Sequence, residues 1–450
     1  MALGHSTRRK LVWLFFAIFL IFGSYLTIKM LGFVIDTKNF RLVKAGGIYV
    51  KFTPRTATLY LDGKKYPETA GFLSNDIYIS GLTPTTHSVS LSLLGYYDWN
   101  KEFSLSSGIV ASSKDIILWP KTLTVDTSST DVTAFWLTKD GPITKTTKGA
   151  LEFENEKIVG KEVVLSNLDS PYVVTKDASN YYFVDLDDTS STLNISAAFS
   201  SLRQKQLGLT NIAKIREIIS HPFTRTKLII TTNASAYILD TKKPELEQLL
   251  TANKLIAYAT SNNDFFAIDS KGVLTISDLL LHTQSEYPLH LEFATGLKAS
   301  PDGEDLLITD AEQHLFHYEV GTQALKKIGT QISFYSFAPD SKRAILIGTN
   351  GDAEILYLKD YEENVIRKQG DVTQFTLTEG EDARSFKWIP FTQNYFLIQA
   401  GNELKAEEFD VRSARNIYSL ANNAIQFALS DRTLFLLSGD NLLTSQRLDK

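Results

Sequence analysis

The sequence contains no cysteine among its 450 residues. This absence excludes disulfide bonds, thiolate catalysis and metal sites that use cysteine ligands. It also argues against a secreted scaffold that depends on cross-links. An excess of positive charge is missing too, because the net charge is −5 and the basic residues form no stripe. We therefore expect no binding to nucleic acid.

Recognisable catalytic motifs are also absent. The sequence has no Gly-x-Ser-x-Gly, no Walker loop and no His-Glu-x-x-His. Of its histidines only His314 and His317 are close, and residues three apart on a strand point to opposite faces. The acidic run at 185–188 does not fit an EF-hand loop, which favours a solvated loop over the alternative of a weak Ca²⁺ site. We expect no catalytic residue, metal or cofactor.

An apolar segment follows the basic residues Arg8, Arg9 and Lys10. Residues 11–28 carry almost no polar side chain, and the apolar character continues to residue 35. This length is enough for a transmembrane helix. A cleaved signal peptide is the rival interpretation, but its apolar core is shorter and no clean cleavage site follows. We predict a cytoplasmic tail at 1–10 and an uncleaved anchor at 11–35.

The orientation of this anchor is predicted from the flanking charge. The basic residues before the segment favour a cytoplasmic N-terminus. Lys38, Arg41 and Lys44 follow the segment closely and weaken that bias. We expect the N-terminus inside and the bulk of the chain outside the cytoplasm.

Residues 45–121 predict a small β-sandwich. The stretch 56–61 alternates and ends at Asp62-Gly63, a strong signal for a type I′ hairpin. The stretch 88–93 alternates strictly, which places Val89, Leu91 and Leu93 on a core face. Residues 116–119 form the closing strand.

This region resembles the PEGA domain, a small β-domain of prokaryotic cell-surface proteins. The matching elements are Gly46-Gly47-Ile48-Tyr49-Val50, Pro54-Arg55-Thr56-Ala57, Leu59-Tyr60-Leu61-Asp62-Gly63, Ile79-Ser80-Gly81-Leu82, Pro84 and Gly95-Tyr96. The Glu and Gly of the family's tetrapeptide are absent here. The resemblance covers about a sixth of the chain and implies a bacterial, surface-exposed interaction or spacer module without catalytic residues.

Three aromatic residues near the end of this region are the candidate binding residues. Aromatic faces stack on sugars, so Tyr96, Tyr97 and Trp99 suggest a carbohydrate site. The favoured alternative is that they pack in the sandwich or cap it.

Residues 122–450 contain a repeated hairpin with a period of about 40 residues, which is typical of a β-propeller. Eight blades are favoured, with seven as the alternative. The equivalent points of the repeats are Trp136, Tyr182, Ile229, Phe266, Leu307, Leu346, Leu397 and Leu436. We expect each hairpin to be the central pair of a blade.

Two further features qualify this propeller. The last blade lacks a strand, and the segment at 122–125 is expected to supply it and close the ring. Residues 197–220 and 244–254 are predicted to be short helical insertions between blades.

Turns such as Ser300-Pro301-Asp302-Gly303 resemble those of TolB-like and WD-repeat-like propellers. The Trp-Asp dipeptide of true WD repeats is missing. The resemblance implies an architecture and no particular function.

The order of anchor, sandwich and propeller predicts a membrane-anchored, non-catalytic protein of the cell envelope that binds a protein, peptide or glycan. One alternative is a propeller glycoside hydrolase, which needs paired carboxylates at the central channel. Another is an extracellular sensor or accessory subunit of an envelope complex.

Overall fold

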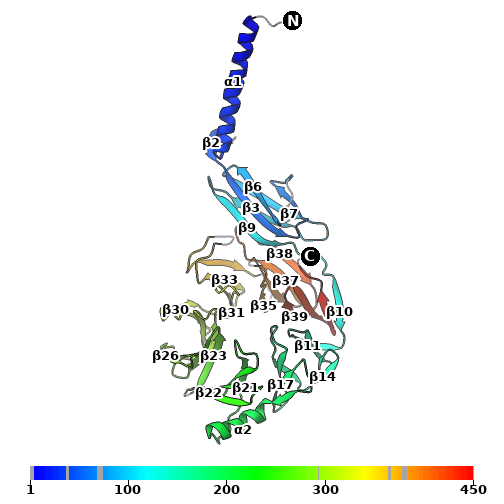
Figure 1. Cartoon of the computed structure of the whole chain (residues 1–450), viewed down its shortest axis with the longest axis vertical. Coiled ribbons are helices and arrows are strands. Elements are labelled where there is room, and N and C mark those ends of the chain that lie inside the picture. Colours follow the sequence, from blue (N-terminus) through cyan, green and yellow to red (C-terminus); the bar gives the residue numbers. More distant parts are fainter. Residues whose placement is uncertain are drawn as a thin grey trace.

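The computed structural model describes residues 5–36, 40–67, 74–252, 254–291, 293–362, 366–377, 383–392 and 394–448. Residues 1–4 of the predicted tail and Lys38 lie outside these ranges. The described chain forms three parts in a row: a long helix, a small unit of two sheets and a ring of sheets (Figure 1).

The N-terminal helix α1 (His5–Met30) begins earlier and ends sooner than the predicted segment 11–35. Gly32 adopts a positive φ of 77° and its N–H donates to the carbonyl oxygen of Lys29 at 3.0 Å, which stops the helix. The chain then forms a hairpin of β1 (Phe33–Asp36) and β2 (Arg41–Lys44). Residues 33–35 therefore belong to this hairpin rather than to the helix.

Two sheets form the unit that follows. One holds, in spatial order, β6 (Asp76–Leu82), β3 (Gly46–Thr53) and β9 (Val110–Ile117); the other holds β5 (Lys64–Lys65), β4 (Thr58–Leu61), β7 (Thr86–Ser92) and β8 (Trp99–Ser104). Ile48 and Phe52 of the first sheet share one core with Leu59, Leu91 and Trp99 of the second. The alternating apolar residues thus meet between the sheets.

The predicted hairpin at Asp62-Gly63 is confirmed. Leu61 pairs with Lys64, and the two turn residues have φ values of 50° and 75°. Positive φ at both central residues is the geometry of a type I′ turn.

Eight four-stranded antiparallel sheets follow in the described residues from Val125 onward. Seven use consecutive strands: β11 (Val132–Leu137), β12 (Pro142–Thr146), β13 (Leu151–Phe153), β14 (Glu156–Ile158); β15 (Glu162–Leu165), β16 (Tyr172–Lys176), β17 (Tyr181–Asp185), β18 (Thr192–Asn194); β19 (Glu217–Ser220), β20 (Lys227–Thr231), β21 (Ser235–Asp240), β22 (Glu245–Thr251); β23 (Leu255–Ser261), β24 (Asp264–Asp269), β25 (Val273–Asp278), β26 (Gln284–Pro288); β27 (Ala294–Ala299), β28 (Asp305–Asp310), β29 (Leu315–Glu319), β30 (Ala324–Gly329); β31 (Ile332–Phe337), β32 (Arg343–Gly348), β33 (Asp352–Tyr357), β34 (Val372–Thr376); β35 (Ala383–Trp388), β36 (Tyr395–Ala400), β37 (Glu403–Glu408), β38 (Ile417–Ala421).

The remaining sheet joins the two ends of the ring. It consists of β39 (Ala424–Ser430), β40 (Thr433–Ser438) and β41 (Asn441–Ser445), with β10 (Val125–Ser129) added beside β41. Val125 pairs with Ser445 and Thr127 with Leu443. The chain therefore closes as predicted, with a strand that starts at the end of the predicted segment 122–125. Radial sheets around a common centre make this part a β-propeller (Figure 1).

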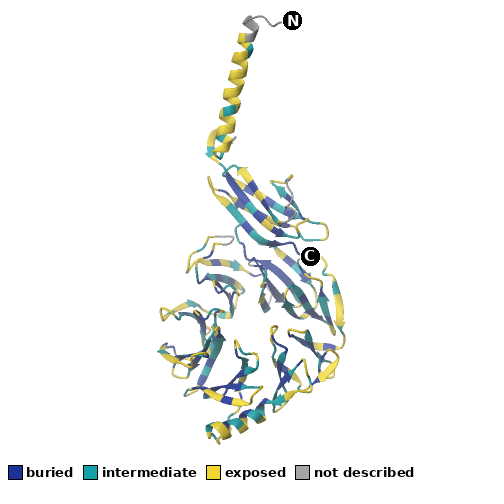
Figure 2. Ribbon diagram, viewed as in Figure 1, coloured by how far each residue is buried: buried dark blue, intermediate teal, exposed yellow. Residues whose placement is uncertain are grey.

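The apolar hairpins consist of the second and third strands of their sheets. These two strands are apolar because neighbouring sheets cover them on both faces (Figure 2). Two of the predicted repeat points are displaced. Trp136 lies on β11, the first strand of its sheet, and Tyr182 lies on β17, a third strand. The weaker apolar character of these two hairpins hid their register.

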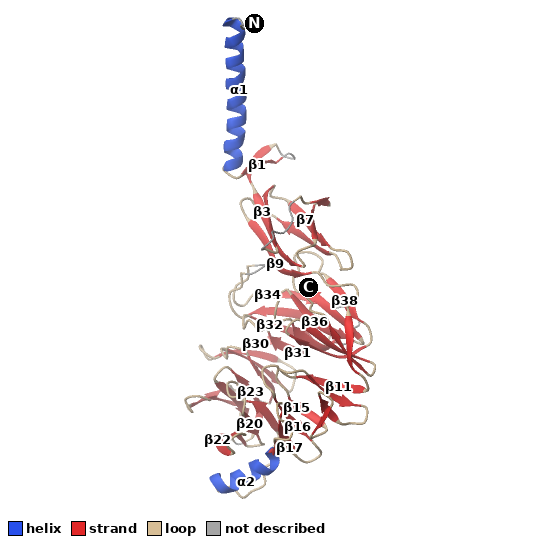
Figure 3. Ribbon diagram, turned by 45° about the vertical axis from the view of Figure 1, so that its right-hand side comes forward, coloured by secondary structure: helices blue, strands red, loops and turns tan. Residues whose placement is uncertain are grey.

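One of the two predicted helical insertions is absent. Helix α2 (Ile195–Leu207) overlaps the first but begins before it, and Gly208 ends the helix with φ 66° (Figure 3), while residues 217–220 of the predicted range belong to β19. Residues 245–251 of the second instead form strand β22, where Leu246 pairs with Leu239. The unpaired edge of β21 recruits this segment, so pairing in the sheet overrides its helical propensity.

Candidate functional site

The central cavity of the propeller is the candidate binding site. Strands β23 and β27, the first strands of neighbouring sheets, lie side by side. Together with β19 and β31 they line a cavity of about 540 Å³. The lining mixes the apolar residues Ile219, Leu297 and Phe337 with the polar residues Glu217 and Lys298. Such a mixture suits an organic ligand or a protein segment more than a free ion.

Tyr258 and Glu217 form a short side-chain hydrogen bond in this cavity. The Tyr258 hydroxyl donates to Oε2 of Glu217 at 2.5 Å. Desolvation and this hydrogen bond raise the pKa of Tyr258 to about 12, so the phenol keeps its proton. The Arg216 guanidinium stacks on the same ring, 5.5 Å from its centroid. The hydrogen bond and the stacked guanidinium hold the Tyr258 ring in place. The ring therefore presents an aromatic face in a fixed orientation.

Lys298 supplies a cation to the same cavity. Its Nζ donates to the carbonyl oxygen of Tyr335 at 2.7 Å and lies over the rings of Phe334 and Tyr335. Desolvation by these neighbours lowers the pKa of Lys298, although the side chain remains accessible from the cavity. None of these contacts of Lys298 is with a carboxylate. The ammonium group therefore favours a ligand that is anionic or rich in carbonyl groups.

The hydrolase alternative requires a pair of carboxylates at the central channel. Among its described lining residues, Glu217 is the one carboxylate. Its Oε2 accepts the hydrogen bond from Tyr258. A glycosidase needs a second carboxyl group on the other side of the scissile bond.

A second cavity of about 310 Å³ lies between the sheets that contain β16 and β20. His221 forms part of its wall and is only 6% exposed. Its buried Nδ1 contacts no hydrogen-bonding partner among the described residues, and burial lowers the pKa of the imidazole to about 4. The ring packs edge-on against Phe223. His221 is therefore neutral at physiological pH and packs as an aromatic side chain.

The predicted carbohydrate-binding aromatics lie at the junction of the sandwich and the propeller. Trp99 is fully buried, and its Nε1 donates to Oε1 of Glu408 at 2.9 Å. Tyr97 donates to the carbonyl oxygen of Ser419 at 3.1 Å and packs on Tyr418. Tyr96 packs against the sandwich core. Trp99 thus has no face left for a sugar, whereas Tyr96 and Tyr97 stay partly exposed.

Buried charges dominate the same junction. Lys101 of β8 contacts Oε2 of Glu408 at 2.7 Å, and both side chains have no exposed surface. The Lys101 ammonium also donates to the carbonyl oxygens of Asp410 and Ala414. Burial raises the pKa of Glu408, although the charge of Lys101 acts to lower it. The pair joins residues that are more than three hundred positions apart, and it fixes the sandwich on one sheet of the ring.

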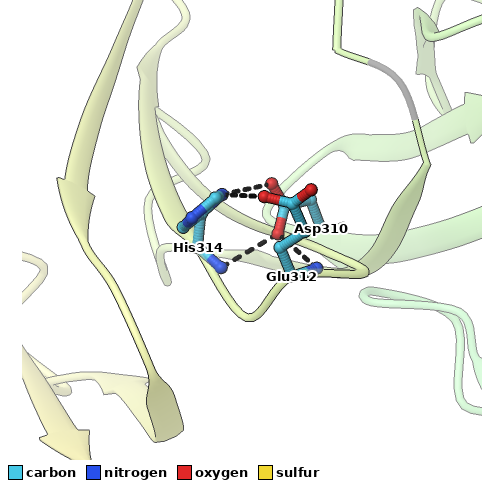
Figure 4. Close-up of side chains that lie close together, drawn as sticks. All are labelled: Asp310, Glu312 and His314. Atoms are coloured by element: carbon cyan, nitrogen blue, oxygen red, sulfur yellow. Dashed lines mark hydrogen bonds and ion pairs between the residues drawn. The ribbon is translucent and has the colours of Figure 1, made fainter.

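A group of possible metal ligands lies in the turn before β29 (Figure 4). The ligand atoms of Asp310, Glu312 and His314 lie within 4.8 Å of one another. Oδ1 of Asp310 accepts the backbone N–H groups of Glu312 and His314, and its Oδ2 contacts Nδ1 of His314 at 2.8 Å. Burial alone would raise the pKa of Asp310, but these hydrogen bonds lower it. The carboxylate thus stabilises the turn itself.

The histidine pair considered in the sequence does not come together. His317 instead contacts Oδ1 of Asp305 at 2.6 Å across the sheet. In the acidic run at 185–188, Asp185 accepts from the N–H of Asp187, and Asp188 accepts from the N–H of Ser190. These local hydrogen bonds fit the predicted solvated loop.

One signal for the junction is present in the sequence and was overlooked. In Trp99-Asn100-Lys101-Glu102-Phe103 the alternation places Lys101 on the apolar face between two aromatic residues. A lysine on the inward face of a strand requires a buried partner. The central cavity had no such signal, because its lining comes from the first strands of four separate repeats.

Comparison with known proteins gives a likeness of fold. No protein-family model matches the sequence, and no curated protein matches it. Among solved structures, Hsv2 of Kluyveromyces lactis is 10% identical, with a TM-score of 0.46, and the match covers 66% of this chain and 100% of that one. A chain of the mitotic checkpoint complex is 15% identical, with a TM-score of 0.42, and the match covers 64% of this chain and 88% of that one. We draw nothing about function from these similarities.

Proposed function

We propose that this chain is a non-catalytic binding protein of a bacterial cell envelope, anchored by α1 with its N-terminus in the cytoplasm. Each of the eight sheets is a blade, and the eight-bladed propeller engages a protein, peptide or glycan outside the cytoplasm. The sandwich is a PEGA-like spacer that holds the propeller away from the lipid. The bacterial origin rests on the resemblance of residues 45–121 to that family.

The observation that carries this proposal is the bare surface of α1. Its segment Arg9–Met30 has 22 residues, apolar enough to cross a membrane, and its most apolar stretch is not buried by the rest of the folded chain. Phe19 and Ile21 are each 71% exposed. At about 1.5 Å per residue the segment spans roughly 33 Å, close to the thickness of a bilayer core. Lipid is the environment that covers such a surface.

The junction supports the role of the sandwich as a spacer. Buried hydrogen bonds and the pair of Lys101 and Glu408 tie β8 to the end of β37. A rigid joint keeps the ring at a constant angle to the anchor. Figure 1 shows the ring of sheets face-on, with the sandwich and α1 extending from its edge.

The topology is tested by cysteine labelling, because the natural chain has no cysteine. Ile212→Cys places a thiol on a fully exposed residue of the propeller, and Ser6→Cys places one before the anchor. A membrane-impermeant maleimide should label the first variant in intact cells and the second only after lysis. The reverse pattern, or a mature chain without its first 30 residues, would refute the proposal.

Binding at the central cavity is tested by cross-linking in the same cells. A photo-reactive amino acid at Ser336, which lines the cavity, should give an adduct that one at Ile212 does not give. Lys298→Ala should reduce the yield of that adduct, because it removes the cation of the cavity. Equal adducts from both sites would show that the cavity has no special role.

A further inference from the structure

The β1–β2 hairpin carries an apolar face that no described part of the molecule covers. Ile35 and Leu42 lie directly opposite each other in the register, so their side chains are on the same face. Ile35 is 56% exposed and Leu42 is 48% exposed. At the turn, Phe40 is 88% exposed.

The other face of the same hairpin is engaged. Asp36 is buried, and its carboxylate contacts Nε of Arg41 at 3.5 Å. Val34 and Val43 on this face are only partly exposed. The hairpin thus has one face turned to the protein and one that presents apolar side chains outward.

The position of the hairpin indicates which environment covers its outer face. It follows α1 directly and lies between the helix and the sandwich (Figures 1 and 3). Met30 and Leu31 at the end of the helix are 87% and 63% exposed, and the hairpin follows them closely in the chain. Lys29 and Lys44 flank these elements in the chain, are exposed and carry charge that suits lipid phosphates.

The backbone of Phe40 adds a second observation. This residue has φ 49°, a conformation that a bulky side chain rarely adopts. The structure thus holds a large aromatic ring directly before β2 with most of its surface exposed. Residues in such conformations often belong to functional contacts.

We propose that the outer face of the β1–β2 hairpin lies in the surface of the bilayer, with Phe40 inserted at the boundary of headgroups and acyl chains. This inference rests on the proposed membrane anchor and goes beyond it. Elements at this boundary are buried by about 5–10 Å. A helix alone can rotate about its axis, whereas a helix and an inserted hairpin make two contacts that limit the tilt and rotation of the propeller.

The test measures membrane depth at single sites of the full chain in nanodiscs of phosphatidylcholine and phosphatidylglycerol. A fluorophore that is sensitive to its environment is attached to Phe40→Cys, with Leu20→Cys as the probe of the anchor and Ile212→Cys as the aqueous control. Iodide quenches labels in water, and lipids that carry a quencher near the headgroup quench labels at the surface. Circular dichroism checks that each variant is folded.

The expected result is a label at position 40 that is protected from iodide and quenched by the lipid, while position 212 shows the opposite. Should position 20 lie in the lipid while position 40 is open to iodide, the hairpin inference fails and the anchor stands. A label at position 20 in water would remove the anchor itself. Protection of position 40 from both quenchers would mean that protein covers the hairpin, which also overturns the inference.

Discussion

Removal of the Lys101 charge is the sharpest test of the junction. Lys101→Met keeps most of the side-chain volume but leaves the Glu408 carboxylate buried with Trp99 and Asn416 as its remaining donors. Breaking a buried ion pair by removing one partner costs about 3–5 kcal/mol. Burial already raises the pKa of Glu408, and the loss of Lys101 removes a charge that lowers it.

This cost has a predictable pH dependence. In the variant the folded-state pKa of Glu408 lies further above its unfolded value, so protonated Glu408 is tolerated in the fold. A group with a raised folded pKa contributes stability at low pH and loses it as the pH rises. The stability difference between wild type and Lys101→Met should therefore narrow as the pH falls below neutrality.

The assay is unfolding in urea, monitored by hydrogen exchange of the backbone amides of β8 and β37. Exchange at these strands is measured because two domains need not unfold in a single transition. Lys51→Met is the matched control. Lys51 belongs to the same sandwich, but its ion pair with Asp115 is 3.7 Å long and largely exposed, so it should change the stability by less than about 1 kcal/mol. The double variant Lys101→Met/Glu408→Gln should be less destabilised than the sum of the two single variants. If Lys101→Met costs no more than Lys51→Met, the reasoning about the buried pair is wrong.

Three further predictions concern the propeller. His221 has a pKa of about 4 in the folded state against 6.5 in the unfolded state. The free energy of unfolding should therefore fall by up to about 3 kcal/mol as the pH falls from 6.5 to 4. His221→Phe should flatten that part of the curve of unfolding free energy against pH. Asp126→Pro removes a backbone donor from the closing pair of β10 and β41, because Gln446 donates to the Thr124 carbonyl oxygen and hydrogen-bonded pairs alternate along the ladder; it should cost about 1–3 kcal/mol and speed proteolysis of the C-terminal strands. Gly272→Ala places a Cβ 2.6 Å from the Leu291 carbonyl oxygen at φ 73°, so its melting temperature should fall further than that of Gly351→Ala, where the same kind of backbone meets no atom within 4 Å.

The propeller could be predicted from sequence because its central strands are buried on both faces. The hairpin of Phe266 and Leu274, for example, has nearly every side chain in a core. Where that pattern weakens, the prediction failed. Trp136 and Tyr182 lie on half-exposed strands, and their apolar residues gave no clear register. The strand β22 was mistaken for a helix because Leu246, Leu249 and Leu250 fit either period.

The candidate sites were beyond the reach of local patterns for a different reason. The central cavity brings together residues from four repeats, and each repeat alone shows only an ordinary strand. Trp99 was recognised as unusual, but its partner Glu408 lies on the far side of the sequence. Only the closure of the ring places β37 and β38 beside the sandwich.

The junction and the membrane-proximal hairpin together determine how the propeller is oriented relative to the anchor. The orientation of the propeller depends on three joints in series: α1 to the hairpin, the hairpin to the sandwich, and the sandwich to β37. The third joint is held by a buried ion pair, and the first by the hydrogen bonds at Gly32 and Ala45. The second joint is the contact of β1 with β6, so a hairpin that also contacts lipid leaves no joint free to swing. Loss of either Phe40 or Lys101 should then broaden the distribution of distances between a label on the propeller and one in the bilayer, while Lys51→Met should leave that distribution narrow.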